Sequence, residues 1–288
     1  MPHSRATKER GVKVFLSLVL VALLLLESPW FFLFIVLIAG PLILTSISGG
    51  WREWCIWMGM LVGFILFAEI RAKMGPTVEA RPLFLYAIQL ETLGGLLPVP
   101  AIWLQDHLQA GFLDAITTAI YLSYFLIPQV VAILLWRVGG PFARFVATTC
   151  LLFGVALLVH YFFPTAPPWM ASAEGMIPPL DRILVRLMFS TSPELAAEGF
   201  QASGNDVAAM PSVHQGLTVL AMIALAHHYP RTRWIGWAYA VLMLFSITYL
   251  GEHYVVDGMA GAAMAWGGWR LSGRVRGTEA EVGIRPGI

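Results

Sequence analysis

The chain has 288 residues, of which 58% are hydrophobic and 12% are charged, and its mean hydropathy is +0.73. A soluble domain of this size needs more charge to cover its surface, so the composition predicts an all-α, polytopic membrane protein. The formal net charge of +1 excludes the strongly basic surface that a nucleic-acid-binding protein would show. Cys55 and Cys150 lie in apolar stretches and form no CxxC pair, which indicates buried thiols without a redox role.

Residues 1–50 predict an N-terminal hydrophobic hairpin. Basic residues precede an apolar stretch over 12–47, which is longer than the roughly 20 residues that one span needs. Pro29 interrupts this stretch and would break or kink a helix, so two short spans over 12–26 and 30–48 fit best. A single kinked helix is the alternative. No small-residue cleavage site follows the first apolar run, which indicates an uncleaved span rather than a signal peptide.

Six further spans are predicted within residues 51–271. They cover 54–70, 114–136, 142–163, 213–228, 234–250 and 254–270. The region 71–111 contains four prolines and apolar pieces too broken to span, so it predicts an interfacial or re-entrant segment. The region 164–210 is a long polar loop, and loops of that length are usually functional or disordered. A polar tail over 272–288 completes a chain of about eight transmembrane helices.

Charge patterning orients these spans. Eight spans put both termini on one side, and thirteen of the 18 Lys and Arg residues fall on that side. The positive-inside rule therefore predicts that both termini are cytoplasmic. The loops 71–111 and 164–210 and the turn at 251–253 then face the extracytoplasmic side. If residues 12–48 form a single kinked helix, only the N-terminus changes side.

Two polar clusters, over 205–214 and 249–257, interrupt the last three spans. Both fall at the extracytoplasmic ends of their spans in this topology. Two helices joined by the short turn at 229–233 would return the chain to the same level of the membrane. The topology alone therefore predicts that the two clusters meet.

The residue types in these clusters suit phosphoryl transfer. Pro211-Ser212 before an apolar run is a helix-start signal, and a helix N-terminus favours bound anions, phosphate among them. His214 would lie in the first turn of that helix. His253 and Asp257 are four residues apart and would share a helix face. A carboxylate so placed can hold one imidazole nitrogen and leave the other free to attack, which is the orienting logic of a catalytic triad.

The sequences Met210-Pro211-Ser212-Val213-His214 and Gly251-Glu252-His253-Tyr254-Val255-Val256-Asp257 resemble two motifs of the type 2 phosphatidic acid phosphatase (PAP2) superfamily. With the Ala166-Pro167-Pro168-Trp169 loop, they are most similar to its inositol-phosphorylceramide synthase branch. The resemblance covers roughly residues 110–270 and implies a six-helix core, here within 51–271. It implies His253 as nucleophile forming a phosphohistidine, His214 as the acid that protonates the leaving alcohol, and Asp257 as the partner of His253.

The same resemblance implies an integral-membrane lipid phosphatase or phosphotransferase with no metal and no cofactor. Its substrate would be a phospholipid or a polyprenyl or other lipid phosphate. Water as acceptor gives hydrolysis, and an alcohol or inositol-containing co-substrate gives transfer, including inositol-phosphate transfer to a lipid acceptor. The motifs do not encode which acceptor is used.

Phosphate binding is where the sequence departs from the family. The arginine of the usual Ser-Arg pair is replaced by Ile247, and the Lys73 to Arg81-Pro82 stretch matches the first motif poorly in spacing and place. Arg182 and Arg186 lie four apart in the outer loop 164–210 and are the candidates to meet the phosphate charge, together with Ser212 at the helix start. A solvated, headgroup-facing amphipathic helix is the alternative for the two arginines.

Other readings of the clusters remain open. His253 and Asp257 could be metal ligands with Glu252 or His214 as a third, although nothing else supplies metal-ligand spacing. A lipid or small-molecule transporter would place its polar groups mid-span, whereas these lie at span ends. An inactive scaffold member is a third alternative, against which the complete His/His/Asp set argues. His160 could line the site or simply end its helix, and Glu91 could contact a polar headgroup.

Overall fold

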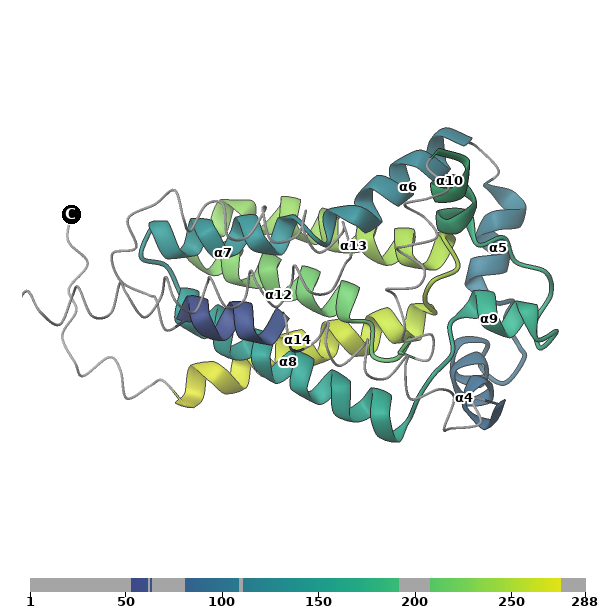
Figure 1. Cartoon of the computed structure of the whole chain (residues 1–288), viewed down its shortest axis with the longest axis horizontal. Helices are drawn as coiled ribbons and strands as arrows, with labels where there is room; N and C mark the ends of the chain where they lie inside the picture. The colour runs from purple at the N-terminus through teal and green to yellow at the C-terminus, as the bar shows by residue number, and fades with distance from the viewer. Residues whose placement is uncertain (1–52, 62, 64–80, 109–110, 192–207, 276–288) are drawn as a thin grey trace, which may run out of the picture.

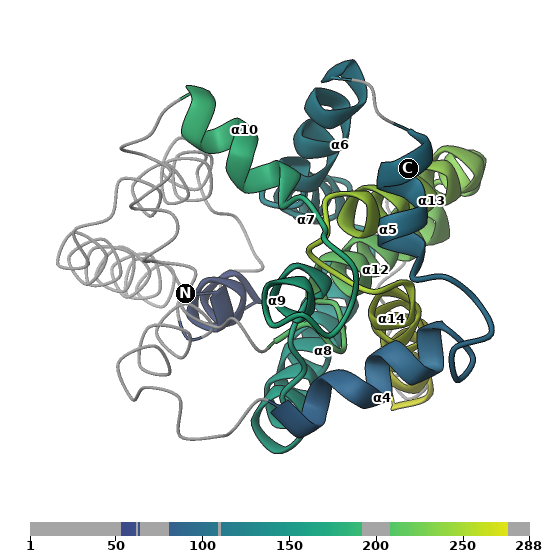
Figure 2. The ribbon, with the colours of Figure 1, turned by 90° about the vertical axis from the view of Figure 1, so that its right-hand side faces the viewer.

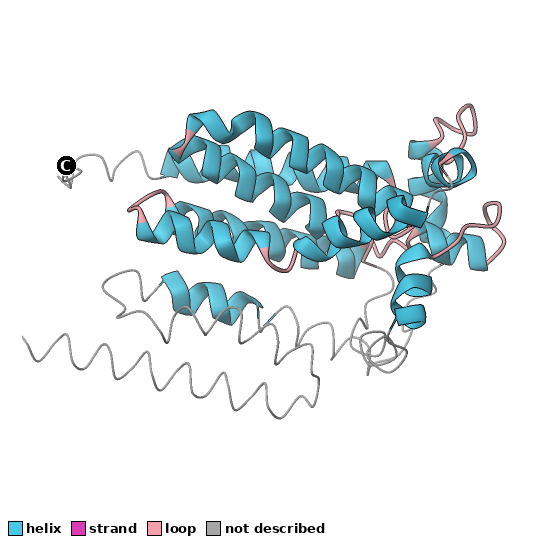
Figure 3. Cartoon of the chain, turned by 90° about the horizontal axis from the view of Figure 1, so that it is seen from above, coloured by secondary structure: helices cyan, strands magenta, loops and turns pink. Residues whose placement is uncertain are grey.

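The computed structural model describes residues 53–61, 63, 81–108, 111–191 and 208–275. The N-terminal hairpin predicted for residues 1–50 lies outside these residues. So does the tail from residue 276 onward, while residues 272–275 of the predicted tail continue the last helix. The regular elements of the described part are all helical, which confirms the all-α class (Figure 3).

The described helices fall into a long set and a short set (Figure 1). The long set runs along the molecule's long axis, and α6 extends past the other long helices toward the short set. This set comprises α6 (Gly111–Ser123), α7 (Ile127–Arg137), α8 (Phe142–Phe162), α12 (Val213–His228), α13 (Arg233–Tyr249) and α14 (Val255–Val275). Residues 53–61 form a further helical segment. The short set gathers at one end and comprises α4 (Arg81–Glu91), α5 (Pro100–His107), α9 (Pro168–Ala173) and α10 (Ile183–Thr191). A 3₁₀ turn, η1 (Pro230–Thr232), joins α12 to α13.

Helix α12 is the centre of the bundle. It packs against α7, α8, α13 and α14, and the end-on view shows these four around it (Figure 2). Its residues 217–221 are buried without interruption, so it is covered on every side there. A helix that is apolar all round belongs in the interior of a bundle, which is where the long apolar pattern of 213–228 places it.

Close approach between α12 and α14 depends on glycines. A Cβ at Gly261 would overlap the carbonyl oxygen of Ser212, and a Cβ at Gly216 would lie 3.1 Å from the carbonyl oxygen of Gly261. Small residues of this kind allow two membrane helices to approach backbone to backbone. The contact brings the N-terminal ends of α12 and α14 together.

The predicted spans agree with the helices in part. Helix α12 coincides with the predicted span 213–228, and α8 and α13 match 142–163 and 234–250 to within a residue. Within the described residues, α8 is the one helix both long and apolar enough to cross a bilayer alone. Helices α6 and α7 would add a second if the pair, bent by 43°, is one broken span. The count of eight spans therefore stays a prediction.

Both predicted outer regions contain short helices. Region 71–111 includes α4 and α5, of 11 and 8 residues, too short to span a bilayer. Region 164–210 includes α9 and α10, of 6 and 9 residues. All four lie at the end of the bundle where α12 and α14 begin, and so they surround the two histidine clusters (Figures 1 and 2).

Candidate active site

The structure brings His214, His253 and Asp257 together. His214 lies in the first turn of α12, His253 two residues before α14, and Asp257 in the first turn of α14. Nε2 of His253 is 3.4 Å from Nδ1 of His214, and Nδ1 of His253 is 3.6 Å from Oδ2 of Asp257. His253 therefore stands between the other two, with one ring nitrogen toward each.

The hydrogen bonds of His253 assign its tautomer. Its Nδ1 donates to the carbonyl oxygen of Ala209, at 3.0 Å, because a carbonyl can only accept. In the neutral imidazole Nε2 then carries the lone pair, and this is the nitrogen that faces His214. Only 6% of His253 is exposed, so its orientation is fixed by these contacts.

Asp257 joins the two histidine clusters. Its Oδ2 accepts from the backbone N–H of Tyr254 at 2.9 Å, and its backbone carbonyl accepts from the N–H of Ser212 at 2.9 Å. Asp257 is completely buried, and its Oδ1 has no hydrogen-bond partner in the described part of the chain. Burying a carboxylate costs free energy unless hydrogen bonds or an opposite charge compensate it, so a buried Asp257 indicates a functional position.

Ser212 caps α12, as the helix-start signal predicted. Its hydroxyl oxygen accepts from the N–H of Gln215 at 3.3 Å, and the residue is fully buried. The preceding carbonyl, of Pro211, accepts from Nε2 of His160 at 3.1 Å. His160 belongs to the last turn of α8 and is buried, so it supports the loop before His214 from behind.

Aromatic side chains form a wall on His214. The rings of Tyr121 and Tyr124 lie with their centroids 4.6 Å and 4.3 Å from that of His214, and Phe125 approaches edge-on at 6.5 Å. These residues end α6 or lie in the turn before α7. Sequence reasoning missed them because they fall inside one predicted apolar span, 114–136. The signal that could have revealed the break is Pro128, the second residue of α7.

The two candidate arginines have different surroundings. Arg182 precedes α10 and makes a two-pronged ion pair with Glu252, the neighbour of His253, at 2.8 and 3.1 Å. Its guanidinium also stacks 3.8 Å from the ring centroid of Trp169. Arg182 is therefore held beside the histidine pair, although sequence reasoning did not foresee Glu252 as its partner.

Arg186 is directed elsewhere. It binds Asp114 of α6 at 2.9 Å and Asp181 at 2.6 Å. These two hydrogen bonds, that to Asp114 first, raise the pKa of Arg186 above its ordinary value, so it stays charged. Asp114 also accepts from the hydroxyl of Tyr249 at 2.7 Å. Arg186 thus ties α10 to α6 and α13.

The Pro-rich loop after α8 is hydrogen-bonded to both segments that carry the histidines. Thr165 pairs with Ala208 in an isolated parallel bridge, and the N–H of Ala209 donates to the Thr165 carbonyl at 2.9 Å. The N–H of Trp169 donates to the carbonyl of Gly251 at 3.1 Å. The loop therefore fastens both histidine-bearing segments, including the Ala209 carbonyl that orients His253.

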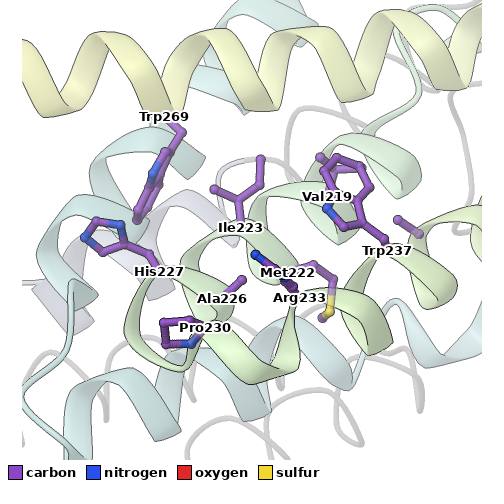
Figure 4. A pocket seen from close by; sticks show the side chains of 10 residues that line it. Val219, Met222, Ile223, Ala226, His227, Pro230, Arg233, Trp237 and Trp269 are labelled. Atoms are coloured by element: carbon purple, nitrogen blue, oxygen red, sulfur yellow. The ribbon is translucent and has the colours of Figure 1, made fainter.

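A cleft of about 320 Å³ lies at the opposite end of α12 (Figure 4). Its walls are mostly apolar, and its titratable side chains are His227 and Arg233. The part of its lining that the structure describes holds no acid and no second histidine, so these residues do not offer the pair of groups that His214 and His253 form. Among the described residues, no three His, Cys, Asp or Glu side chains form a metal-binding group.

Comparison with known proteins gives a family match. The family model of the PAP2 superfamily matches residues 91–271. The chain is 33% identical over 122 residues to the inositol phosphorylceramide synthase catalytic subunit aur1 of Schizosaccharomyces pombe, covering 40% of this chain and 28% of that protein. It is 28% identical over 173 residues to the inositol phosphorylceramide synthase of Candida albicans, covering 54% and 35%.

A third relative is the corresponding catalytic subunit AUR1 of Saccharomyces cerevisiae, 29% identical over 128 residues that cover 40% of this chain and 30% of that protein. The chain thus spans about a third of the length of these curated relatives. No solved structure matches it.

Proposed function

The chain belongs to the PAP2 superfamily, and from that premise we propose that it is a membrane-embedded lipid phosphotransferase or phosphatase in which His253 is the nucleophile. Its similarity to inositol phosphorylceramide synthases makes it an enzyme of this phosphatase and phosphotransferase class. The observation that carries the proposal is the His253 geometry: Nδ1 donates its proton to the Ala209 carbonyl, and Nε2 carries the lone pair and lies 3.4 Å from Nδ1 of His214.

In the first step, Nε2 of His253 attacks the phosphorus of a lipid phosphate or phosphodiester. The new N–P bond forms as the bond between phosphorus and the leaving alcohol oxygen breaks, and protonated His214 gives its proton to that oxygen. The product is a phosphohistidine. In the second step, neutral His214 takes a proton from the acceptor hydroxyl, the acceptor oxygen bonds phosphorus, and Nε2 of His253 leaves with its electron pair.

Asp257 and Ala209 support the charge that this chemistry creates. Attack through Nε2 makes the His253 ring cationic, and its Nδ1–H already points at the Ala209 carbonyl. The carboxylate of Asp257, 3.6 Å from Nδ1, then stabilises the cation electrostatically. The sequence prediction gave this carboxylate the direct hydrogen bond. The geometry gives that bond to the backbone carbonyl and leaves Asp257 as the charged neighbour.

Arg182 and the N-terminus of α12 are proposed to meet the phosphate charge. The α12 N-terminus, with its partial positive charge, begins one residue before His214. Arg182 is held beside His253 by Glu252, and a phosphate with greater charge density could draw it away from that carboxylate. Arg186 is assigned to the structural pair with Asp114 and Asp181 instead.

The substrate class and the orientation in the membrane complete the proposal. The names of the synthase relatives favour transfer to a lipid or inositol-containing alcohol over hydrolysis. The arginine and lysine distribution favours cytoplasmic termini and a site that faces the extracytoplasmic side. A lipid substrate would then reach the histidine pair from the outer leaflet.

The test is product analysis with purified protein in EDTA. Lipid phosphates and phosphoinositides are offered with and without ceramide or diacylglycerol, and His253→Ala is compared with His227→Ala, a histidine at the other end of α12. Free phosphate lost only in His253→Ala establishes a phosphatase, and a new phospholipid lost only there establishes a transferase. Turnover that persists in His253→Ala, or no turnover on the whole panel, overturns the proposal and favours transport or an inactive scaffold.

A further inference from the structure

The first turn of α14 has one of the two hydrogen bonds of a capping box from its own residues and needs the other from elsewhere. Tyr254 occupies the N-cap position, and Asp257, three residues on, accepts from the N–H of Tyr254 as the acid of a capping box does. The reciprocal bond should come from a short polar side chain at the N-cap, which accepts from the second or third N–H of the helix. The long aromatic side chain of Tyr254 cannot reach back to those N–H groups.

Glu91 supplies the missing acceptor from another part of the chain. Its Oε2 accepts from the N–H of Val256, the second residue of α14, at 3.0 Å across 165 residues of sequence. Glu91 is the last residue of α4, and only 7% of it is exposed. Buried carboxylates are rare unless they are bound, so this bond accounts for the position of the side chain.

We propose that Glu91 is a positioning residue of the active site, which caps α14 in place of Tyr254 and thereby fixes Asp257 and His253. This inference rests on the function proposed above. Asp257 uses the same oxygen, Oδ2, for the Tyr254 N–H and for the approach to His253. When the first turn of α14 is held by Glu91, that oxygen stays in place. When the turn frays, the carboxylate of Asp257 is no longer held at a fixed position relative to the imidazole of His253.

The electrostatics of Glu91 suit a neutral cap. The pKa of Glu91 is raised to about 7, chiefly by burial and in smaller part by the charge of Asp257, while the hydrogen bond from Val256 lowers it. Asp257 and the phenol of Tyr254, from the start of α14, are the titratable groups whose charges couple to it. On its own helix, the phenol of Tyr86 couples to Asp257. A protonated Glu91 still accepts from Val256 through its carbonyl oxygen, and it places no second negative charge beside Asp257 and the incoming phosphate.

The experiment compares Glu91→Ala and Glu91→Gln with the wild type and with Gln89→Ala, an exposed position on the same helix. Steady-state kcat and KM are measured from pH 5.5 to 8.5 with the lipid phosphate or phosphoinositide of the panel above which the wild type turns over fastest. Glutamine keeps the carbonyl acceptor without an ionisable group. We expect Glu91→Ala to lower kcat by about tenfold to a hundredfold with KM changed less than about threefold, since small misplacements of catalytic groups cost this much. Glu91→Gln and Gln89→Ala should stay within about threefold of wild type at pH 6.

The pH profile separates positioning from a purely structural role. Ionisation of Glu91 should lower wild-type kcat as pH rises through about 7, and Glu91→Gln should lack this decline. Identical pH profiles of wild type and Glu91→Gln, or wild-type kcat in a folded Glu91→Ala, overturn the inference. If Glu91→Ala does not fold, the Glu91→Gln profile still decides. Loss of turnover in His253→Ala with no effect at Glu91 rejects this inference alone, whereas turnover that survives in His253→Ala rejects the proposed function.

Discussion

The two ends of helix α12 each carry histidine, and they differ in what converges on it. At the first turn, His214 contacts His253 and the aromatic rings of Tyr121 and Tyr124. At the last turn, His227 is exposed, packs against the edge of Trp269 at 5.6 Å, and borders an apolar cleft without an acid (Figure 4). The same residue type on the same helix therefore has a second histidine and a buried carboxylate nearby at the first turn, the end where we propose catalysis.

This difference shows that the candidate site depends on several segments that are distant in sequence and meet at one end of α12, and not on α12 alone. Segments around residues 91, 121, 165, 182, 209 and 253 contact the first turns of α12 and α14 or the loops that precede these helices. At the other end, the cleft is lined by residues of α12, α13 and η1 and by Trp269 of α14. Substitutions that alter the convergent end should change chemistry, and matched ones at the other end should not.

The largest expected effect is the loss of the nucleophile. His253→Ala removes the atom that would bond phosphorus, so we expect turnover to fall by at least about 10³-fold, on the scale of other nucleophile deletions. His227→Ala should keep turnover within about twofold. Product formation by both purified variants gives the measurement. A surviving rate in His253→Ala, or an equal loss in both variants, would remove the distinction between the two ends.

Asp257→Asn tests the charge at the convergent end. The amide keeps the size of the carboxylate but supplies no negative charge to the cationic ring of His253. We expect kcat to fall by roughly 10²- to 10⁴-fold with little change in KM, as replacement of the acid in a triad does. Single-turnover trapping of phosphorus on the protein should show slower formation of the intermediate. Unaltered kcat in a folded Asp257→Asn would mean that the Ala209 bond alone suffices.

Glu91 gives a prediction on stability. Its folded pKa is raised from 4.5 to about 7, so its contribution is fully present below pH 4.5 and is lost as pH rises through about 7. The full change is on the order of 3 kcal/mol, since one pKa unit corresponds to about 1.4 kcal/mol. Thermal unfolding in detergent should show Tm falling across this range for wild type and a flatter profile for Glu91→Gln. Parallel profiles would mean that Glu91 does not titrate within it.

The sequence predicted the long apolar helices best. Residues 213–228 formed α12 with the predicted start at Ser212, because an apolar run and a capping signal are local features. The meeting of the two histidine clusters also followed, since two helices of similar length return the chain to one level. The polar residues at the ends of the predicted spans thus indicated that His214, His253 and Asp257 lie close together.

The surroundings of the histidines were not predictable in the same way. Glu91, Tyr121 and Glu252 act through partners 165, 93 and 70 residues away in sequence, namely Val256, His214 and Arg182. No periodicity or spacing encodes such contacts, because they depend on how segments far apart in the sequence pack against one another. The break between α6 and α7 has a local signal in Pro128, the second residue of α7, but that signal does not indicate that Tyr121 and Tyr124 pack against His214.

The smallest expected effect separates the two arginines that the sequence treated alike. Arg182→Gln should lower kcat/KM by about tenfold, because one charged contact to phosphate is worth about 1.5–3 kcal/mol before the exchange with Glu252 is counted. Arg186→Gln should leave kcat/KM within about twofold and lower stability by about 1 kcal/mol, since its half-exposed side chain binds two carboxylates in a partly screened setting. Kinetics and thermal unfolding of both variants check this. If Arg186→Gln costs more activity than Arg182→Gln, the phosphate lies toward α6 and the assignment must be reversed.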